Sequence, residues 1–320
     1  DKECIRDWTM AHEVQPGAYA IKDYDFKKPT APQLSVVKRP YKHAQGALEI
    51  FDYPGEFDTV GEGDAYVRIR LDELHAQYET VRAACNVRAL AVGDVFELDN
   101  PEQAGAAADA KYLVTEAAYD IGAGLEFEAQ GPHFGCTFAC IRSDEQFRPQ
   151  RATPKPTVQG PQTATVVGPS GEEIHTDEYG RIKVKFHWDR HSKDDKESSC
   201  WVRVSHPWAG KAWGAVSIPR IGQEVIVDFL EGDPDRPIVT GRVYNAEQMP
   251  PFPLPEGAVV SGIKSSTHKG RGFNELSMDD TAGKEQVKIH AQYDMSVAVL
   301  HDQTNEIKNN RSTHVVVNDA

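Results

Sequence analysis

Several features that would assign a chain to a familiar class of protein are missing from these 320 residues. No run approaches the roughly 18 apolar residues that cross a bilayer as a helix. The first 30 residues contain no charged segment followed by an apolar one. The sequence therefore predicts neither a membrane anchor nor export by a signal peptide. The chain opens on Asp1 rather than on methionine, which predicts a fragment of a longer protein.

Cysteine and positive charge are both scarce. The five cysteines are odd in number and scattered, which favours a reducing compartment over a secreted fold held by disulfides. We therefore expect assembly in the cytoplasm. The net charge of −14 has the wrong sign for a general binder of nucleic-acid phosphates, so no nucleic acid is expected among the partners.

Motifs for catalysis or metal binding are also lacking. There is no Gly-x-Ser-x-Gly nucleophile elbow, and paired carboxylates such as Asp279 and Asp280 lie in polar runs that are typical of solvated surface. His133, Cys136 and Cys140 have the spacing of three soft ligands, but no fourth ligand follows at zinc-finger spacing. The sequence therefore predicts no enzyme activity, no cofactor and no metal site in this chain.

Proline marks the borders between the segments that are present. Stiff proline-rich stretches lie at 153–157 and 249–255. They predict a first domain over 1–157 that is truncated at its N-terminus, a second domain over 158–247, a linker over 248–261, and a C-terminal needle segment over 262–320.

The first domain is predicted to contain short strands and one helix. The strands are expected near 47–51, 94–98 and 111–115, bounded by turn-forming residues. One set of apolar residues recurs at steps of four and three, which predicts a helix with a single apolar stripe. The set is Val67, Leu71, Leu74, Tyr78, Val81 and Cys85.

The second domain is predicted to be almost all strand and turn. Residues 181–188 alternate strictly, with Ile182, Val184, Phe186 and Trp188 on one face. Five or six such strands in about 90 residues, without a helix, predict a small closed barrel such as an OB-fold, with a sandwich as the alternative.

The barrel mixes cations with indole rings, which could bind single-stranded nucleic acid by stacking. The residues concerned are Lys183, Lys185, Trp201, Trp208 and Trp213. The net charge of −3 over 158–247 argues against this use and favours packing or contact between subunits.

The C-terminal segment repeats every eight residues from Asp294 onward. A turn-forming residue recurs at the first position of each octad, and a β-branched residue recurs at the sixth. The turn positions are Asp294, Asp302, Asn310 and Asn318, and the β-branched positions are Val299, Ile307 and Val315. The pattern predicts one short strand per octad, although an unfolded tail with a coincidental pattern remains the alternative.

These octads cannot be stable in one chain. Burying one β-branched residue per octad releases less free energy than is needed to order the backbone of its eight residues. A narrow ribbon also leaves both strand edges without hydrogen bonds. Three copies wound about an axis would pair the edges and enclose Val299, Ile307 and Val315, so we expect a homotrimer with these residues in its core.

Longer motifs resemble those of a known family. The second domain contains DEYGR at 177–181, FHWD at 186–189, CWVRV at 200–204, IPRIGQEV at 218–225, FLEGDPDRP at 229–237 and GRVYN at 241–245. The first domain contains FDYPG at 51–55. Together these motifs resemble VgrG, the valine-glycine repeat spike family of type VI secretion systems.

The resemblance implies a mainly β fold similar to the hub and spike of contractile phage tails: a hub-like β-barrel domain with a helix, an OB-fold, and the start of a trimeric β-helix. It implies a homotrimer on the Hcp tube with a PAAR tip protein and effector cargo, which punctures the target membrane. Such a spike is assembled in the bacterial cytoplasm and then secreted by the type VI system to the extracellular space or a target cell. The alternative is an effector-carrying enzyme whose catalytic domain lies beyond residue 320.

Overall fold

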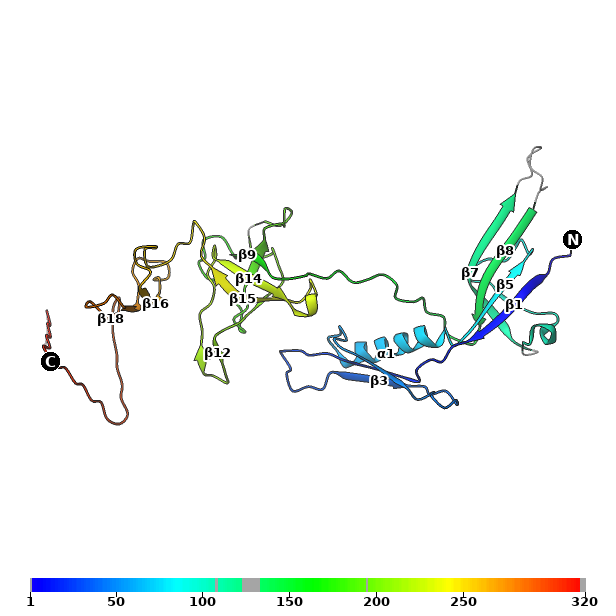
Figure 1. The fold of residues 1–320 in the computed structure, drawn as a ribbon, viewed down its shortest axis with the longest axis horizontal. Coiled ribbons are helices and arrows are strands. Elements are labelled where there is room, and N and C mark those ends of the chain that lie inside the picture. Colours follow the sequence, from blue (N-terminus) through cyan, green and yellow to red (C-terminus); the bar gives the residue numbers. More distant parts are fainter. Residues whose placement is uncertain (1, 107–108, 123–132, 194, 317–320) are drawn as a thin grey trace. The chain divides into compact units, whose positions relative to one another are not determined.

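The computed structural model describes residues 2–106, 109–122, 133–193 and 195–316, and the chain divides into two compact units, Asp1–Pro154 and Lys155–Ala320. The regular secondary structure of both units is mainly β-strand (Figure 1). In the described part, no helix has the length and apolar character needed to cross a membrane. The prediction of a mainly β fold is confirmed.

The first unit contains a five-stranded antiparallel sheet in the order β1-β5-β8-β7-β6. The strands are β1 Ile5–His12, β5 Glu79–Cys85, β6 Val95–Glu97, β7 Lys111–Gly122 and β8 His133–Arg142, with a short 3-10 helix at Pro101–Ala104. One face is buried in a core that includes Val81, Tyr112, Phe138 and Cys140. Because alternate residues of each strand point to this face, the core follows a period of two.

A second, smaller sheet in this unit is covered by the helix. Its order is β3-β2-β4, with β2 Ala18–Lys22, β3 Leu34–Lys38 and β4 Glu49–Asp52. Figure 1 shows the helix α1, Val60–His75, lying along this sheet. Val67 and Leu71 of the helix pack on Tyr19 and Ile21 of β2, which makes a separate small core.

The helix begins where its sequence caps it and ends earlier than the apolar stripe predicted. Thr59 and Glu62 form a capping box, in which each side chain accepts a hydrogen bond from the other residue's backbone N–H. The predicted stripe holds for Val67, Leu71 and Leu74, but its extension to Tyr78, Val81 and Cys85 is wrong. Tyr78 follows the helix in a turn, and the last two residues lie in β5.

The error has a physical cause. Val81, Ala83 and Cys85 also repeat at the period of a strand, and all three are buried. β5 is a central strand that pairs with β1 on one side and β8 on the other. Two ladders of hydrogen bonds therefore favour the strand over a further turn of helix.

The buried thiols give a first prediction. Cys85, Cys136 and Cys140 lie in the core of the large sheet, and burial raises the pKa of Cys136 to about 11 and of Cys140 to about 12. Because the thiolate is the reactive form, we expect a maleimide at neutral pH to label at most Cys4 and Cys200 in the folded protein, and all five thiols in denaturant. Mass spectrometry counts the adducts; rapid native labelling of a third thiol would contradict this core.

The second unit contains a closed barrel. Its sheet has the order β10-β9-β14-β15-β11, with β9 Gln162–Val167, β10 Lys183–Phe186, β11 Arg203–Val204, β14 Glu224–Phe229 and β15 Pro237–Val243. Just before β10 and β11, Ile182 and Val202 exchange two backbone hydrogen bonds of 2.9 and 2.8 Å. This bridge joins the two ends of the sheet, so the barrel of an OB-fold is found and the sandwich is not.

The interior of the barrel is filled by β-branched side chains. Eight of its residues are essentially inaccessible to solvent: Ala164, Val166, Ile182, Val184, Val202, Val225, Val227 and Val239. The predicted inward alternation of Ile182, Val184 and Phe186 is found, but Trp188 at its end is largely exposed. Trp188 stacks on Phe186 and donates its indole N–H to Gln162.

Outside the barrel sheet, the second unit contains two further groups of strands. One is a short hairpin of β12 Trp208–Ala209 and β13 Gly214–Ala215. The other is an antiparallel sheet of β16 Val260–Lys264, β17 Glu275–Asp279 and β18 Gln286–His290, in that order. A 3-10 helix spans Leu230–Gly232. Residues 291–316 contain no strand within the single chain.

Candidate intersubunit surface

The sheet of β16–β18 has its apolar face turned outward. Ile263, Leu276 and Ile289 lie opposite one another in a single row across the three strands, and Met278 lies opposite Val287 in the next row. These five side chains are 43–76% exposed in the single chain. Together they form a continuous apolar patch, which we call the sheet face. A patch of this kind marks a surface that another molecule covers.

The opposite side of the same sheet is polar and already satisfied within the chain. Glu275, although buried, lies 3.1 Å from the ammonium of Lys288 and 3.9 Å from that of Lys264, and it accepts a hydrogen bond from Ser277. The hydrogen bonds from Ser277 and Lys288 lower the pKa of Glu275. Both ammonium groups also face the ring of Phe273. Within this sheet, the polar side thus has partners from its own chain, whereas the sheet face is exposed.

The sheet is attached to the barrel by polar contacts. The guanidinium of Arg220 donates a 2.7 Å hydrogen bond to the carbonyl of Ser266 and lies 3.4 Å from Glu173. Lys269 pairs with Glu172 at 2.9 Å, and its backbone N–H donates to Glu173. These contacts link the loop between β16 and β17 to the barrel wall.

The predicted core residues of the octads are about half exposed in the single chain. Val299, Ile307 and Val315 have 46–51% of their surface accessible, whereas Leu300 and Val316 have 102% and 82%. The side chains of Glu306 and Lys308, on either side of Ile307, lie 3.9 Å apart. Of the predicted turn residues, Asp294, Asp302 and Asn310 are exposed, and Asn318 lies outside the described residues. Their roles in turns and in a trimer core stay predictions.

The reasoning from sequence missed the five residues of the sheet face. The signal was present, because ELSMD at 275–279 and QVKIH at 286–290 alternate apolar and polar residues in the manner of half-buried strands. The sequence-based prediction instead placed the contact between copies in the octads, from Asp294 onward. The structure adds Ile263, Leu276, Met278, Val287 and Ile289 to the candidate surface.

The three residues with the spacing of soft metal ligands, His133, Cys136 and Cys140, do not converge. Cys136 and Cys140 point into the core of the large sheet, whereas His133 is exposed near Asp120, at 3.3 Å. The two cysteines lie at even-numbered positions of β8 and the histidine at an odd-numbered one. They therefore point to opposite faces of the sheet. Across the residues that the structure describes, no group of three or more metal-ligating side chains is arranged around one point.

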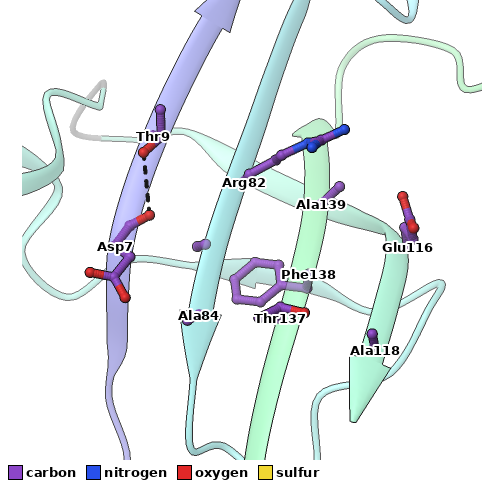
Figure 2. A pocket seen from close by; sticks show the side chains of 10 residues that line it. Asp7, Thr9, Arg82, Ala84, Glu116, Ala118, Thr137, Phe138 and Ala139 are labelled. Carbon is purple, nitrogen blue, oxygen red and sulfur yellow. Dashed lines mark hydrogen bonds between the residues drawn. The ribbon is translucent and has the colours of Figure 1, made fainter. Parts of the chain in front are cut away.

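A shallow cavity of about 410 Å³ lies on the outer face of the large sheet, and Figure 2 shows the side chains around it. Its floor is made mostly of small residues, with Arg82 near the middle and the carboxylates Asp7 and Glu116 at opposite margins (Figure 2). Those carboxylates belong to β1 and β7, which are three strand spacings, or roughly 14 Å, apart. This exceeds the ~5–9.5 Å between the carboxylates of glycoside hydrolases, so the cavity supplies no such pair.

Three family models match the chain in succession. A phage tail baseplate hub (GPD) model covers residues 1–125, a type VI secretion and phage-baseplate injector OB-domain model covers 163–244, and the model of the bacteriophage T4 gp5 C-terminal trimerisation domain covers 261–320. Spike protein VgrG1b of Pseudomonas aeruginosa is 46% identical over 98% of this chain. The chain belongs to the VgrG family. The resemblance seen in the sequence motifs is thereby confirmed.

Other relatives agree with this assignment. VgrG1a of P. aeruginosa is 47% identical over 94% of the chain, and the actin cross-linking toxin VgrG1 of Vibrio cholerae is 40% identical over 97% of it. The chain spans 43%, 48% and 29% of the lengths of VgrG1b, VgrG1a and the toxin, which is less than half of each. Among solved structures, a Francisella PdpA-VgrG complex matches with a TM-score of 0.46 and 6% identity, over 90% of this chain and 53% of that one.

Proposed function

We propose that this VgrG chain forms the hub, barrel and needle base of a homotrimeric type VI secretion spike, whose role is structural. The outward sheet face is the observation that carries the proposal. The apolar side of this sheet is exposed, whereas Glu275 and Ser277 on its polar side are buried. This is the reverse of what a sheet in a single chain normally shows, and we infer that other copies cover the apolar side. The matched trimerisation model over 261–320 supports further copies of this chain as the cover.

In this proposal the spike sits on the Hcp tube, carries a PAAR tip protein and effector cargo, and is driven through a target membrane. It is assembled in the cytoplasm and leaves the cell through the type VI system. The spike names of the P. aeruginosa relatives support this placement. Stiffness is the property such a device needs, and hydrogen bonds between chains would provide it, because no octad could open without breaking contacts to two neighbours.

We further propose that these 320 residues catalyse no reaction. The wide separation of Asp7 and Glu116 and the lack of a nucleophile elbow support this view. The alternative is a spike that carries an enzyme domain beyond residue 320, a possibility that the name of the V. cholerae toxin raises. Assays of actin cross-linking, peptidoglycan hydrolysis and lipid hydrolysis separate the two, because the 320-residue chain is expected to be inactive in all three.

The oligomeric state tests the proposal directly. Light scattering on the purified chain is expected to give three times the 35.5 kDa of one copy. The physical reason is that the sheet face and the octads can both be covered only between chains. The measurement is made at roughly 100 µM protein, because copies that associate with a micromolar Kd would then be assembled. A mass of one copy at this concentration would reject the proposal.

A further inference from the structure

The β12–β13 hairpin presents two exposed tryptophans to solvent. Trp208 and Trp213 are 63% and 59% exposed, and their rings meet edge to face with centroids 5.4 Å apart. Neither indole N–H has a hydrogen-bond partner among the described residues. Tryptophan is highly buried on average, and it is enriched among the residues that dominate protein interfaces.

The hairpin is built to hold these rings in place. The backbone N–H of Gly210 donates a 2.9 Å hydrogen bond to the carbonyl of Trp213 across the turn. A Cβ on Gly210 would lie 2.3 Å from the Trp213 ring, and one on Gly214, where φ is +136°, would lie 2.4 Å from the Trp208 carbonyl oxygen. Glycine at both positions is thus required for this shape. A rigid aromatic surface loses little conformational entropy when it binds.

The base of the hairpin is incompletely filled in the single chain. A cavity of about 360 Å³ lies there, between the segment that enters the hairpin and strand β15, with His206, Ser217 and Arg242 in its lining. The Nδ1 atom of His206 is buried and has no hydrogen-bond partner among the described residues. The cavity beside this ring leaves room for a group from another molecule.

The position of the hairpin in the chain indicates which molecule covers it. The segment leaving β13 reaches Arg220 within five residues, and Arg220 bonds to Ser266 in the region matched by the trimerisation model. The hairpin surface is therefore connected to a predicted contact between copies. The chain's net charge of −14, with Lys211 as the one cation at the hairpin tip, disfavours an acidic membrane or a nucleic acid.

We propose that Trp208, Trp213 and the His206 cavity form a second contact between copies of this chain, at the level of the OB-fold barrel. This contact rests on the proposed homotrimer and extends it from the needle base to the barrel. The indoles supply apolar area, and the neighbouring copy fills the cavity beside His206. Barrels joined in this way resist splaying when the spike is pushed from behind.

Photo-crosslinking tests the contact. p-Benzoylphenylalanine is placed at Lys211, and at Lys196 as a matched control in an exposed polar loop of the same barrel. After illumination of the trimer, we expect adducts of two and three chains at Lys211, at least about five times more abundant than at Lys196. Trp208→Ala together with Trp213→Ala should reduce the Lys211 adduct to the level of the control.

The outcomes separate this inference from the proposed function. A trimer by light scattering without interchain adducts at Lys211 would overturn the hairpin contact and leave the spike intact. A monomer would overturn both. Phosphatidylglycerol vesicles are added in a parallel experiment, and an adduct to lipid in place of the interchain adduct would also reject the inference, because it would identify the hairpin as a membrane contact.

Discussion

Leu276→Asp is expected to convert the trimer into monomers. Leu276 is the middle residue of the row formed with Ile263 and Ile289, so the substitution puts one carboxylate per copy into the centre of the covered sheet face. Three buried charges without counterions should cost at least about 4 kcal/mol, or a thousandfold in the dissociation constant. Sedimentation velocity at protein concentrations of roughly 1–50 µM measures the loss of the trimer, because this range detects dissociation with a micromolar Kd.

The monomer itself should remain folded. Leu276 is already 47% exposed in the single chain, so the barrel loses no interior contact. Ala282→Asp is the matched control, because it adds the same carboxylate to the turn between β17 and β18, away from the sheet face. If Leu276→Asp and Ala282→Asp both remained trimeric, the sheet face would not be an interface.

Ile307→Asp is expected to melt the needle segment while leaving part of the assembly in place. Ile307 is the predicted core residue of the middle octad, and its replacement removes buried apolar area and adds charge at the axis. We expect the trimer to weaken by about a hundredfold, or roughly 2.7 kcal/mol, because the sheet face still joins the copies. Hydrogen exchange of residues 294–316 should change from protected to unprotected.

Thr304→Asp serves as the control for this experiment. In an extended chain Thr304 points away from Ile307, toward the side occupied by Glu306 and Lys308, which lie close together in the structure. The control should keep slow exchange in the octads. Equal loss of protection in both variants would show that the eight-residue register was assigned wrongly, and unprotected octads in the parent trimer would support the unfolded tail.

Local patterns were enough to predict much of the barrel. Ile182 and Val184 alternate with lysines, and this alternation corresponds to their burial because a strand with one face in a core must repeat every two residues. The family motifs of the second domain lie in the same strands and in the turns between them. Sequence therefore predicted both the barrel and the family with good agreement.

Periodicity was insufficient where one set of residues satisfied two periods. Val81 and Cys85 are four apart and suit a helix, but they are also separated by an even number and suit a strand. The choice depended on β1 and β8, which lie elsewhere in the sequence and supply hydrogen bonds on both sides. The capping box of Thr59 and Glu62 was a local signal for the true helix start that was overlooked.

The candidate intersubunit surface was also only partly predictable from the sequence. The octads were visible as a repeat, but the sheet face depends on the pairing of β16, β17 and β18, and only that pairing aligns Ile263, Leu276 and Ile289 in one row. The orphaned nitrogen of His206 and the exposure of Trp208 and Trp213 likewise depend on where the rest of the barrel lies.

By itself, the sequence determined the strand character of the barrel, the eight-residue repeat and membership of the VgrG family, because these follow from local alternation and from motifs read along the chain. The tertiary structure alone decided where α1 ends, that the bridge between Ile182 and Val202 closes the barrel, and which side of the β16–β18 sheet is left uncovered. These features depend on contacts between residues far apart in the chain, and the free energy of such contacts is absent from any short stretch of sequence.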